Sequence, residues 1–491
     1  MLRNGNYITK NLETIFLLII LTYMALLLVV GRLTATSTSN DAFFVGERKS
    51  PWYMVAFGMI GASISGVTFI SVPGMVLTQD MTYLQMCIGF IFGYAVVAFV
   101  LLPVYYRQRL TTIYSLLGTR MGQRSHKTAT FFFLLSKMTG AAVRFFLICM
   151  LLQQYFLRDY GIPFPITVIA LVLMIWLYTR RSGIRTIVWT DVLQTFCIFL
   201  ALILIICAVI SQLGMSPGEA VAAVTESSYS RVFVFDDFSS TQNFWKQFLS
   251  GIFIVIVMTG LDQDMMQKNL TCSSLHDAQK DVCSYSFAFV PANLLFLTLG
   301  VLLVLLSAKN GVPLPEKGDD LLPMYAATGE LGTAVAALFI LGMVASSFSS
   351  ADSALAALTT CVCVDLLGNA DDKRVRSMTH VAVTALFIIM VVMLWYVQSP
   401  SAITLIYTLC GYTYGPLLGL FAFALFTHRA VRDSAVPCIC ILSPLVCLAV
   451  ETMSQQICGY KFGYELLMLN GAMTFAGCLI MSKKKKKMNK T

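Results

Sequence analysis

The chain of 491 residues is 57% hydrophobic and only 12% charged, with a mean hydropathy of +0.77. Soluble proteins carry about 25% charged residues, so this composition excludes a soluble multidomain protein and indicates an integral membrane protein. The formal charge of +9 does not indicate nucleic-acid binding, because Lys and Arg lie in short clusters between apolar runs. Most of the 14 cysteines lie inside apolar runs, so we expect no structural disulfide.

A helix that crosses about 30 Å of hydrocarbon needs about 20 mostly apolar residues. Runs of this length predict an all-α fold of about thirteen transmembrane helices, in a single polytopic membrane domain over 1–491. The predicted spans are 14–33, 52–76, 82–106, 128–157, 163–180, 186–213, 244–262, 282–308, 331–362, 377–397, 401–427, 434–453 and 463–481. We expect the first to be a retained helix, because no small-residue cleavage site follows it.

Lys and Arg predict the orientation, because cytoplasmic loops are enriched in both. With the C-terminus inside, 24 of the 34 Lys and Arg residues lie in inner segments and 8 in outer ones, which leaves Lys137 and Arg144 within a span. Lys268 is counted among the inner-loop residues. An odd number of spans then puts the N-terminus outside. The basic segment 482–491 is expected to be a cytosolic topological anchor, with binding to anionic lipid as the alternative.

The second predicted span contains the sequence GASISG, which begins at Gly61 and ends at Gly66. Such a helix can break, and unwinding there would free the carbonyls of Gly61 and Ile64 to coordinate a cation, as discontinuous transporter helices do near the membrane midplane. Small residues also let helices approach closely, and this alternative explains the composition equally well.

Four ionisable residues stand out within the predicted spans, where each is costly unless it faces protein, water or an ion. Lys137 and Arg144 are two helical turns apart in the fourth span, so they can point to a similar side. Asp191 and Asp352 lie in the sixth and ninth spans. These four residues are therefore candidates for a site inside the membrane domain.

The ninth span carries Ser346, Ser349, Ser350 and Ser353, a spacing that places four hydroxyls on one stripe of a helix. A hard cation such as sodium prefers oxygen ligands, and hydroxyls with backbone carbonyls can supply them. A single membrane serine more often bonds to the carbonyl four residues earlier or holds a neighbouring helix. Four on one stripe, with Asp352 among them, favour a cation site.

The sequence has no recognisable catalytic or nucleotide-binding signature. None of its four histidines lies in an HExxH motif, and we find no phosphate-binding glycine loop. We therefore expect neither an enzyme nor an ATP-driven pump. Uphill transport would have to use an ion gradient.

Three segments of the chain resemble the sodium:solute symporter family. They are NDAFFVGERKSPWYMVAFGMIGASISGVTFI, GIRTIVWTDVLQ, and TGLDQDMMQKNL together with SSFSSADS. The resemblance implies the inverted-repeat fold of the leucine transporter, with a 5+5 helix core. Its repeats would be 52–213 and 244–427, with 14–33 and 434–481 as peripheral helices.

The resemblance also implies where sodium binds. The principal site would use the carbonyls of Gly61, Ile64 and Ser346 with the hydroxyls of Ser349 and Ser350. A second sodium site, present in only some members, would use Asp191 with Ser349, Asp352 and Ser353. Asp352 stands where some relatives carry Ser or Thr. Two neighbouring carboxylates could bind sodium more tightly or could share a proton.

For the solute, the resemblance points to the membrane midplane beside the broken second span. Ser65 and Thr68 match positions that contact substrate in sialic-acid-transporting relatives, and Arg144 lies close to an Arg that binds the substrate carboxylate there. Gln85 is a further candidate. A buried Arg binds a carboxylate through two parallel hydrogen bonds, so we favour a sugar acid such as sialic acid, or a sugar. Pairing of Arg144 with a structural carboxylate or carbonyl is the alternative.

The sequence thus predicts a sodium-coupled symporter that works by alternating access, acts as a monomer and lies in a bilayer, with a bacterial inner membrane favoured. Its partners would be sodium and a small-molecule solute, with no nucleic acid. Proton coupling through the same carboxylates is one alternative. A transporter-like membrane sensor that moves no solute is another.

Overall fold

The computed structural model describes residues 2–484 apart from 36, 158–159, 182, 239, 328–329, 398–401 and 461, and these residues are almost entirely helical. The helices of the first half are α1 (Leu2–Thr34), α2 (Asn40–Val45), α3 (Trp52–Ser63), α4 (Gly66–Gln79), α5 (Tyr83–Val96), α6 (Leu102–Arg107), α7 (Ser115–Arg120), α8 (Gln123–Leu152), α9 (Phe164–Thr179), α10 (Ile184–Leu213) and α11 (Pro217–Glu226). Those of the second half are α12 (Phe244–Val255), α13 (Gln263–Asn269), α14 (Leu275–Asn310), α15 (Leu321–Ala326), α16 (Thr333–Cys361), α17 (Lys373–Val397), α18 (Ala402–Phe426), α19 (Val436–Cys458) and α20 (Leu466–Ile480).

Short elements extend or join these helices. The π-helical turns are η2 (Val97–Leu101), η3 (Gln153–Leu157), η6 (Ile256–Gly260) and η8 (Val362–Leu366), and the 3₁₀ turns are η1 (Gly46–Arg48), η5 (Ser228–Ser230), η7 (Gly318–Asp320) and η9 (Asp433–Ala435). Strands β1 (Arg429–Val431) and β2 (Ser482–Lys484) pair antiparallel. The start of the predicted basic tail is therefore a strand, and its residues 485–491 lie outside the described part of the chain.

The apolar helices coincide with the predicted spans. Within the described residues, the helices long and apolar enough to cross a membrane are Tyr83–Arg107, Gln123–Leu152, Ile184–Leu213, Leu275–Asn310, Thr333–Leu366, Lys373–Tyr396 and Asp433–Ile457. Two bent helix pairs pass the same test together, and the shorter apolar helices are Leu18–Thr34, Phe164–Thr179, Gly411–Phe426 and Leu466–Ile480. Every predicted span falls on one of these. The count of thirteen crossings stays a prediction because four of the helices are short.

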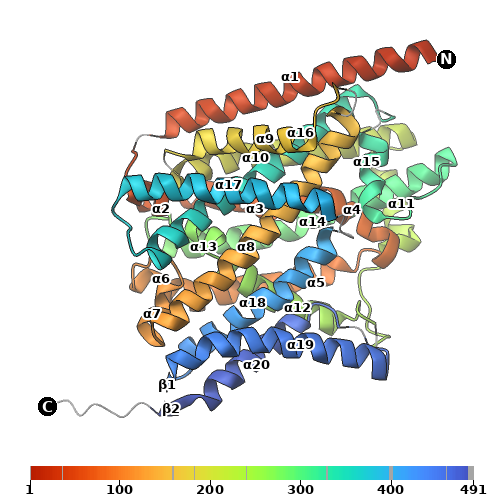
Figure 1. Ribbon diagram of the computed structural model, residues 1–491. Helices are drawn as coiled ribbons and strands as arrows, with labels where there is room; N and C mark the ends of the chain where they lie inside the picture. The colour runs from red at the N-terminus through yellow and green to blue at the C-terminus, as the bar shows by residue number, and fades with distance from the viewer. Residues whose placement is uncertain are drawn as a thin grey trace.

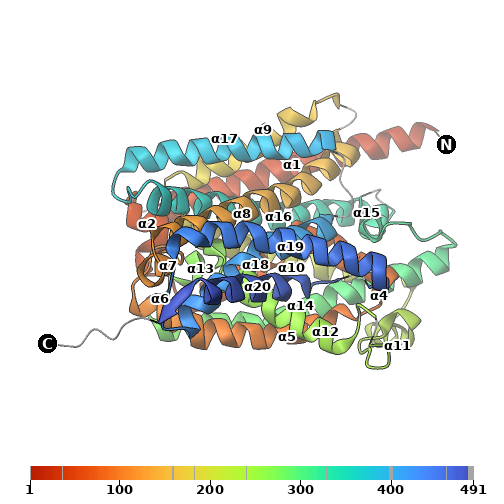
Figure 2. The same ribbon diagram turned by 60° about the horizontal axis from the view of Figure 1, so that its bottom comes forward.

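Helix α16 lies at the centre of the bundle, and its small residues let neighbours pack closely around it. It packs against α8 and α10, and most of its apolar stretch is buried inside the bundle. Helix α1 lies along one edge of the bundle, and α19 and α20 lie along the opposite edge (Figure 1). Helix α1 begins at one end of the bundle and β2 lies at the other, as both views show (Figure 2).

The second predicted span is a broken helix, as its sequence predicts. Helices α3 and α4 meet at a bend of 58°, and Ile64 at the break has φ −85° and ψ 85°. The N–H of Ile64 still bonds to the carbonyl of Ile60, so the carbonyls that follow lack an intrahelical partner. Ser65 starts the second half by accepting a hydrogen bond from the backbone N–H of Thr68 at 3.4 Å.

Close helix packing occurs at the same break, so both explanations of its small residues hold. A Cβ at Gly61 would lie 2.0 Å from Thr195 Oγ1 of α10, and one at Gly66 would lie 2.3 Å from Ser347 Oγ of α16. The two halves of the broken helix are therefore pressed against α10 and α16.

A second broken helix was not predicted from the sequence. The predicted span 244–262 continues past its expected end, because α12 with η6 is followed by α13 at a bend of 71°. The Asp262 carboxylate caps α13 by accepting a hydrogen bond from Asp264 N at 2.9 Å. Lys268, which the charge count placed in a cytosolic loop, therefore lies in a buried half-helix, with only 1% of its surface exposed.

Glycine also sets the distance between α5 and α12. A Cβ at Gly251 of α12 would lie 2.3 Å from the backbone oxygen of Met86 in α5. Gly251→Ala should therefore force the two helices apart and lower the free energy of unfolding by about 1–3 kcal/mol, the usual range for overpacking. Thermal unfolding of purified protein measures this. The control is Gly218→Ala, because a Cβ at Gly218 would meet no atom within 4 Å. Equal stability of the two variants would contradict the prediction.

Candidate functional site

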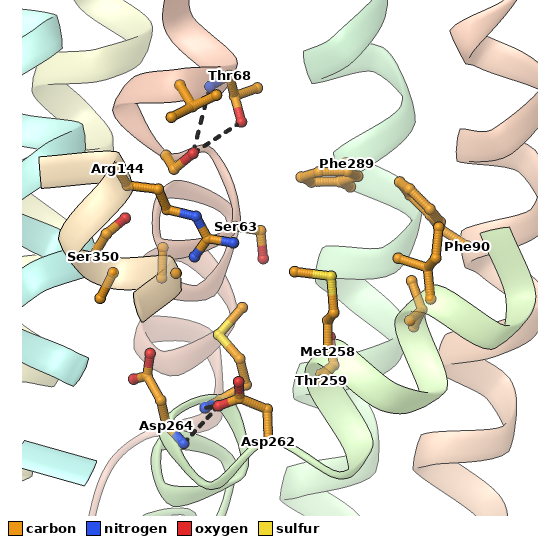
Figure 3. A pocket seen from close by; sticks show the side chains of 18 of the residues that line it. Ser63, Thr68, Phe90, Arg144, Met258, Thr259, Asp262, Asp264, Phe289 and Ser350 are labelled. Atoms are coloured by element: carbon orange, nitrogen blue, oxygen red, sulfur yellow. Dashed lines mark hydrogen bonds between the residues drawn. The ribbon is translucent and has the colours of Figure 1, made fainter. Parts of the chain in front are cut away.

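The two helix breaks face one cavity in the middle of the bundle. Its wall includes Ser63, Ser65 and Thr68 beside the first break, and Asp262 and Asp264 at the second. Helices α5, α8, α14, α16 and α18 complete the lining. Figure 3 shows Arg144 of α8 reaching into this space, with Phe90 and Phe289 on the opposite wall.

Two of the predicted principal sodium ligands line this cavity, whereas Gly61, Ile64 and Ser346 are not among its lining residues. Ser349 and Ser350 of α16 line it together with Ser63 and Ser65 from the broken helix. The carbonyl of Ser346, another predicted ligand, accepts a hydrogen bond from Ser350 Oγ at 3.2 Å. The hydroxyls of Ser349 and Ser350 thus line the same cavity as the first helix break, where a desolvated cation could bind.

Most of the serine stripe also bonds to its own helix. Ser350 and Ser353 donate hydrogen bonds to the carbonyls four residues earlier, and Ser346 donates to Met343 O at 3.0 Å. Ser349 differs, because its hydroxyl donates to Asp191 Oδ1 of α10 at 2.6 Å. A hydroxyl that donates to a carboxylate keeps its lone pairs for a cation, so Asp191 orients Ser349 as a ligand.

The residues of the predicted second sodium site contact two residues that the prediction lacked, Tyr178 and Lys268. Asp352 accepts hydrogen bonds from Tyr178 OH at 2.7 Å and from Ser353 Oγ at 3.1 Å. Asp191 lies 2.8 Å from Lys268 Nζ, which reaches it from α13. All five side chains are buried.

The two basic residues of the fourth span both line the cavity, but they have different surroundings. Lys137 Nζ lies 2.6 Å from the Asp264 carboxylate and 3.2 Å from that of Asp262, which also accepts a hydrogen bond from Tyr414 OH at 2.5 Å. The Arg144 guanidinium has no ion pair or hydrogen bond among the described residues. Lys137 therefore neutralises carboxylates of the second break, and the Arg144 guanidinium remains available to a ligand.

Gln85, a predicted solute-binding residue, makes its hydrogen bonds outside the cavity. Gln85 does not line the cavity; its amide nitrogen donates to Gln242 O at 2.9 Å and its amide oxygen accepts from Val234 N at 3.0 Å. Its side chain is fully buried by these contacts. Gln85 instead attaches α5 to the loop that precedes α12.

Sequence reasoning missed Asp262, Asp264 and Lys268 as members of the site. The segment TGLDQDMMQKNL contains all three, but its mixture of charges resembles an ordinary loop after a span. The available signal was the dense polar sequence that directly follows an apolar helix.

One end of the cavity is closed by contacts between α13 and the segment from α6 to α7. Gln263 Nε2 donates to Thr111 O at 2.9 Å, and Tyr106 OH donates to Asn269 O at 2.9 Å. Further hydrogen bonds run from Ile113 N to Gln263, from Tyr114 to Leu261 O, from Tyr105 to Gly260 O and from Arg48 to Leu110 O.

A bundle with two broken helices around a central polar site is the architecture of a secondary transporter. The sequence profile of the sodium:solute symporter family matches residues 43–441. The chain belongs to this family, and it couples the transport of a small solute to sodium.

Two similar proteins are symporters of sialic acid. The sodium/sialic acid symporter SiaT of Proteus mirabilis is 23% identical over 453 residues, which cover 87% of this chain and 88% of SiaT. The sodium/sialic acid symporter NanT of Aliivibrio fischeri is 24% identical over 439 residues, which cover 85% of each chain.

Solved structures share the fold. The substrate-bound, outward-open state of a Na⁺-coupled sialic acid symporter superimposes with a TM-score of 0.80 at 20% identity, covering 96% of this chain and 99% of that one. Mhp1, a nucleobase-cation-symport-1 family transporter, superimposes with a TM-score of 0.56 at 15% identity, covering 91% and 95%. The predicted leucine-transporter-like fold is therefore confirmed, while the repeat boundaries stay predictions.

Ser350→Ala should weaken sodium binding, because it removes a hydroxyl that lines the cavity beside the helix break. We expect the sodium concentration for half-maximal uptake to rise roughly tenfold, the equivalent of about 1.4 kcal/mol. Uptake into proteoliposomes at varied sodium measures this. The control is Ser347→Ala on the same helix, because Ser347 Oγ donates to Met343 O and does not line the cavity. The same sodium dependence in both variants would count against the site.

Proposed function

We propose that this protein imports an organic acid together with sodium, and that a sugar acid such as sialic acid is the favoured solute. The observation that carries the proposal is the Arg144 guanidinium, which points into the cavity without a partner among the described residues (Figure 3). A guanidinium offers several N–H donors in a planar fork that matches a carboxylate. A bound carboxylate would supply the missing counter-charge.

The rest of the cavity suits a ring that carries hydroxyl groups. Ser65 and Thr68 lie beside the break, with their hydroxyl oxygens 3.4 Å apart. Phe90 and Phe289 form an apolar wall across from Arg144 (Figure 3). Binding sites commonly combine an apolar wall with a few polar groups that orient the ligand. The two sialic acid symporters that resemble this chain support the same class of solute.

Sodium would bind between the break and α16 in this proposal. Its ligands are the carbonyls of Gly61, Ile64 and Ser346 with the hydroxyls of Ser349 and Ser350. The ion would tie the broken helix to α16, and Ser65 directly follows Ile64, which supplies the nearest of these carbonyls. Bound sodium would thereby shape the solute cavity that lies directly above it.

In this proposal, the end of the cavity that is closed by contacts of α13 faces the cytosol. The sealed end holds α6, α7 and the strand near the C-terminus, which the charge distribution places in the cytosol. Alternating access requires the hydrogen bonds between α13 and this end to break while the outer end closes. An outside N-terminus, a bacterial inner membrane and action as a monomer belong to this proposal.

Sodium can drive a substantial gradient. One ion that enters across 100 mV releases about 2.3 kcal/mol, and a tenfold concentration ratio adds about 1.4 kcal/mol. Together these support roughly 500-fold accumulation of an uncharged solute per ion. A monoanion carried with one sodium ion gains nothing from the membrane potential, so its limit is the sodium ratio itself.

Uptake into proteoliposomes tests the proposal. We expect an imposed sodium gradient to drive uptake of labelled sialic acid, and choline in place of sodium to abolish it. An imposed pH gradient without sodium should not drive uptake; if it does, the coupling ion is the proton. Accumulation of neutral sugars but not of acids would contradict the assignment of an acid as the solute. The absence of any uptake in a folded preparation would favour the sensor alternative.

Arg144→Gln should abolish binding of the acid and leave sodium binding intact, because Arg144 is not a predicted sodium ligand. We expect the apparent affinity for the acid to fall at least a hundredfold, since a charge-assisted pair of hydrogen bonds is lost. Arg144→Lys is the control, because it keeps the positive charge but loses the planar pair of donors. Its affinity for the acid should lie between those of the parental protein and of Arg144→Gln. Competition between labelled and unlabelled acid measures this. Unchanged affinity in Arg144→Gln would remove this residue from the site.

A further inference from the structure

Lys268 is a buried cation inside the site that was expected to hold a second sodium ion. Its Nζ lies 2.8 Å from Asp191 Oδ2, and both side chains are no more than 2% exposed. Nζ has no hydrogen-bond acceptor in the described part of the chain, so the charge of Asp191 is what holds it there. The residue also lines the solute cavity.

The ammonium occupies the free side of Asp191. The other carboxylate oxygen, Oδ1, accepts the hydrogen bond from Ser349 Oγ at 2.6 Å. A second sodium ion at Asp191 would need one of these two oxygens. Ser349 donates to one of them and the Lys268 ammonium lies 2.8 Å from the other, so an ion at Oδ2 would compete directly with the ammonium.

The neighbouring carboxylate offers no better place. Asp352 Oδ2 accepts a hydrogen bond from Tyr178 OH at 2.7 Å, and Oδ1 accepts one from Ser353 Oγ at 3.1 Å. Lys137 cannot supply charge to this group, because it is engaged by Asp264 at 2.6 Å and by Asp262 at 3.2 Å. Among the described residues, Lys268 is therefore the side chain that offsets the negative charge of the group around Asp191.

Charge balance then decides how many sodium ions fit. Asp191 and Asp352 contribute two negative charges, and Lys268 contributes one positive charge. One sodium ion at the neighbouring principal site brings the charge of these three side chains to zero, whereas a second would leave this group with a net positive charge. An uncompensated charge is costly where little water screens it.

We propose that the ammonium of Lys268 takes the place of a second sodium ion, so that this transporter binds one sodium ion per chain. The proposal rests on the sodium-coupled function proposed above and specifies its stoichiometry. Because Lys268 belongs to α13, the pair with Asp191 also ties the second broken helix to α10. The ammonium is covalently part of α13, so it can hold α13 to α10 throughout the transport cycle, whereas a sodium ion at this place would be released.

Counting bound ions tests the proposal. Equilibrium binding of ²²Na⁺ to the purified protein, with choline as the replacement ion, should saturate at one ion per chain. Lys268→Met removes the charge from a side chain of similar length, so Asp191 becomes free and the count should rise to two. Lys268→Arg keeps the charge and should remain at one. The double variant Lys268→Met/Asp191→Asn removes both charges and should also bind one.

The sodium dependence of the melting temperature tests the same variants independently of ion counting. Lys268→Met leaves Asp191 without a counter-ion in choline, so its melting temperature should rise more steeply with sodium than that of the parental protein. The double variant should return to the parental dependence. This comparison remains informative if the single variant folds only in high sodium, because that behaviour is itself the expected requirement for a second ion.

The outcomes separate this proposal from the proposed function. Two sodium ions bound by the parental protein would overturn the role of Lys268 and leave sodium coupling intact. A count of one in folded Lys268→Met would show that the ammonium does not fill a cation site. No sodium bound by the parental protein would instead contradict the proposed function. The parental count decides between one and two even if Lys268→Met cannot be purified.

Discussion

The interrupted helices α3–α4 and α12–α13 impose the requirement on which the rest of the structure depends. A backbone break at membrane depth exposes carbonyl and N–H groups that lipid cannot satisfy, so it must lie against protein or a polar cavity. Helix α16 meets the first break with a stripe of hydroxyls. The second break is capped by Asp262, whose carboxylate accepts from the N–H of Asp264. The central polar cavity is the place where both requirements are met.

Charge in the middle of the bundle is organised into two groups that have different tasks. Lys137 with Asp262 and Asp264 holds the second break in place through ion pairs of 2.6 and 3.2 Å. The second group consists of Lys268, Asp191 and Asp352. Its two carboxylates accept hydrogen bonds from Ser349 and Ser353 of the serine stripe. Removing one partner of such a buried pair commonly costs about 3–5 kcal/mol, because the remaining charge is left unpaired. Arg144 belongs to neither group, which explains why it can serve a solute.

The same contacts connect ion binding to the movement of helices. Ser349 is the shared residue, since its hydroxyl donates to Asp191 while its lone pairs face the proposed ion. Asp191 in turn pairs with Lys268 of α13, and α13 is held closed by hydrogen bonds such as that from Tyr106 to Asn269 O. An ion at the stripe is therefore separated from the closed end by one chain of direct contacts. Release of sodium and opening of that end can influence each other through this chain.

Sequence alone determined the membrane class, the positions of the spans and the break at GASISG, because apolar length and small residues act locally. It also determined the serine stripe, since helical periodicity places residues at i, i+3, i+4 and i+7 on one face. Only the tertiary structure decided the partners of Asp191, Lys137 and Gln85. Lys268 was assigned to a loop because hydropathy cannot distinguish a solvated lysine from one that meets a carboxylate 77 positions away in the chain. Pairing between distant helices depends on how they pack, and packing is a property of the whole bundle.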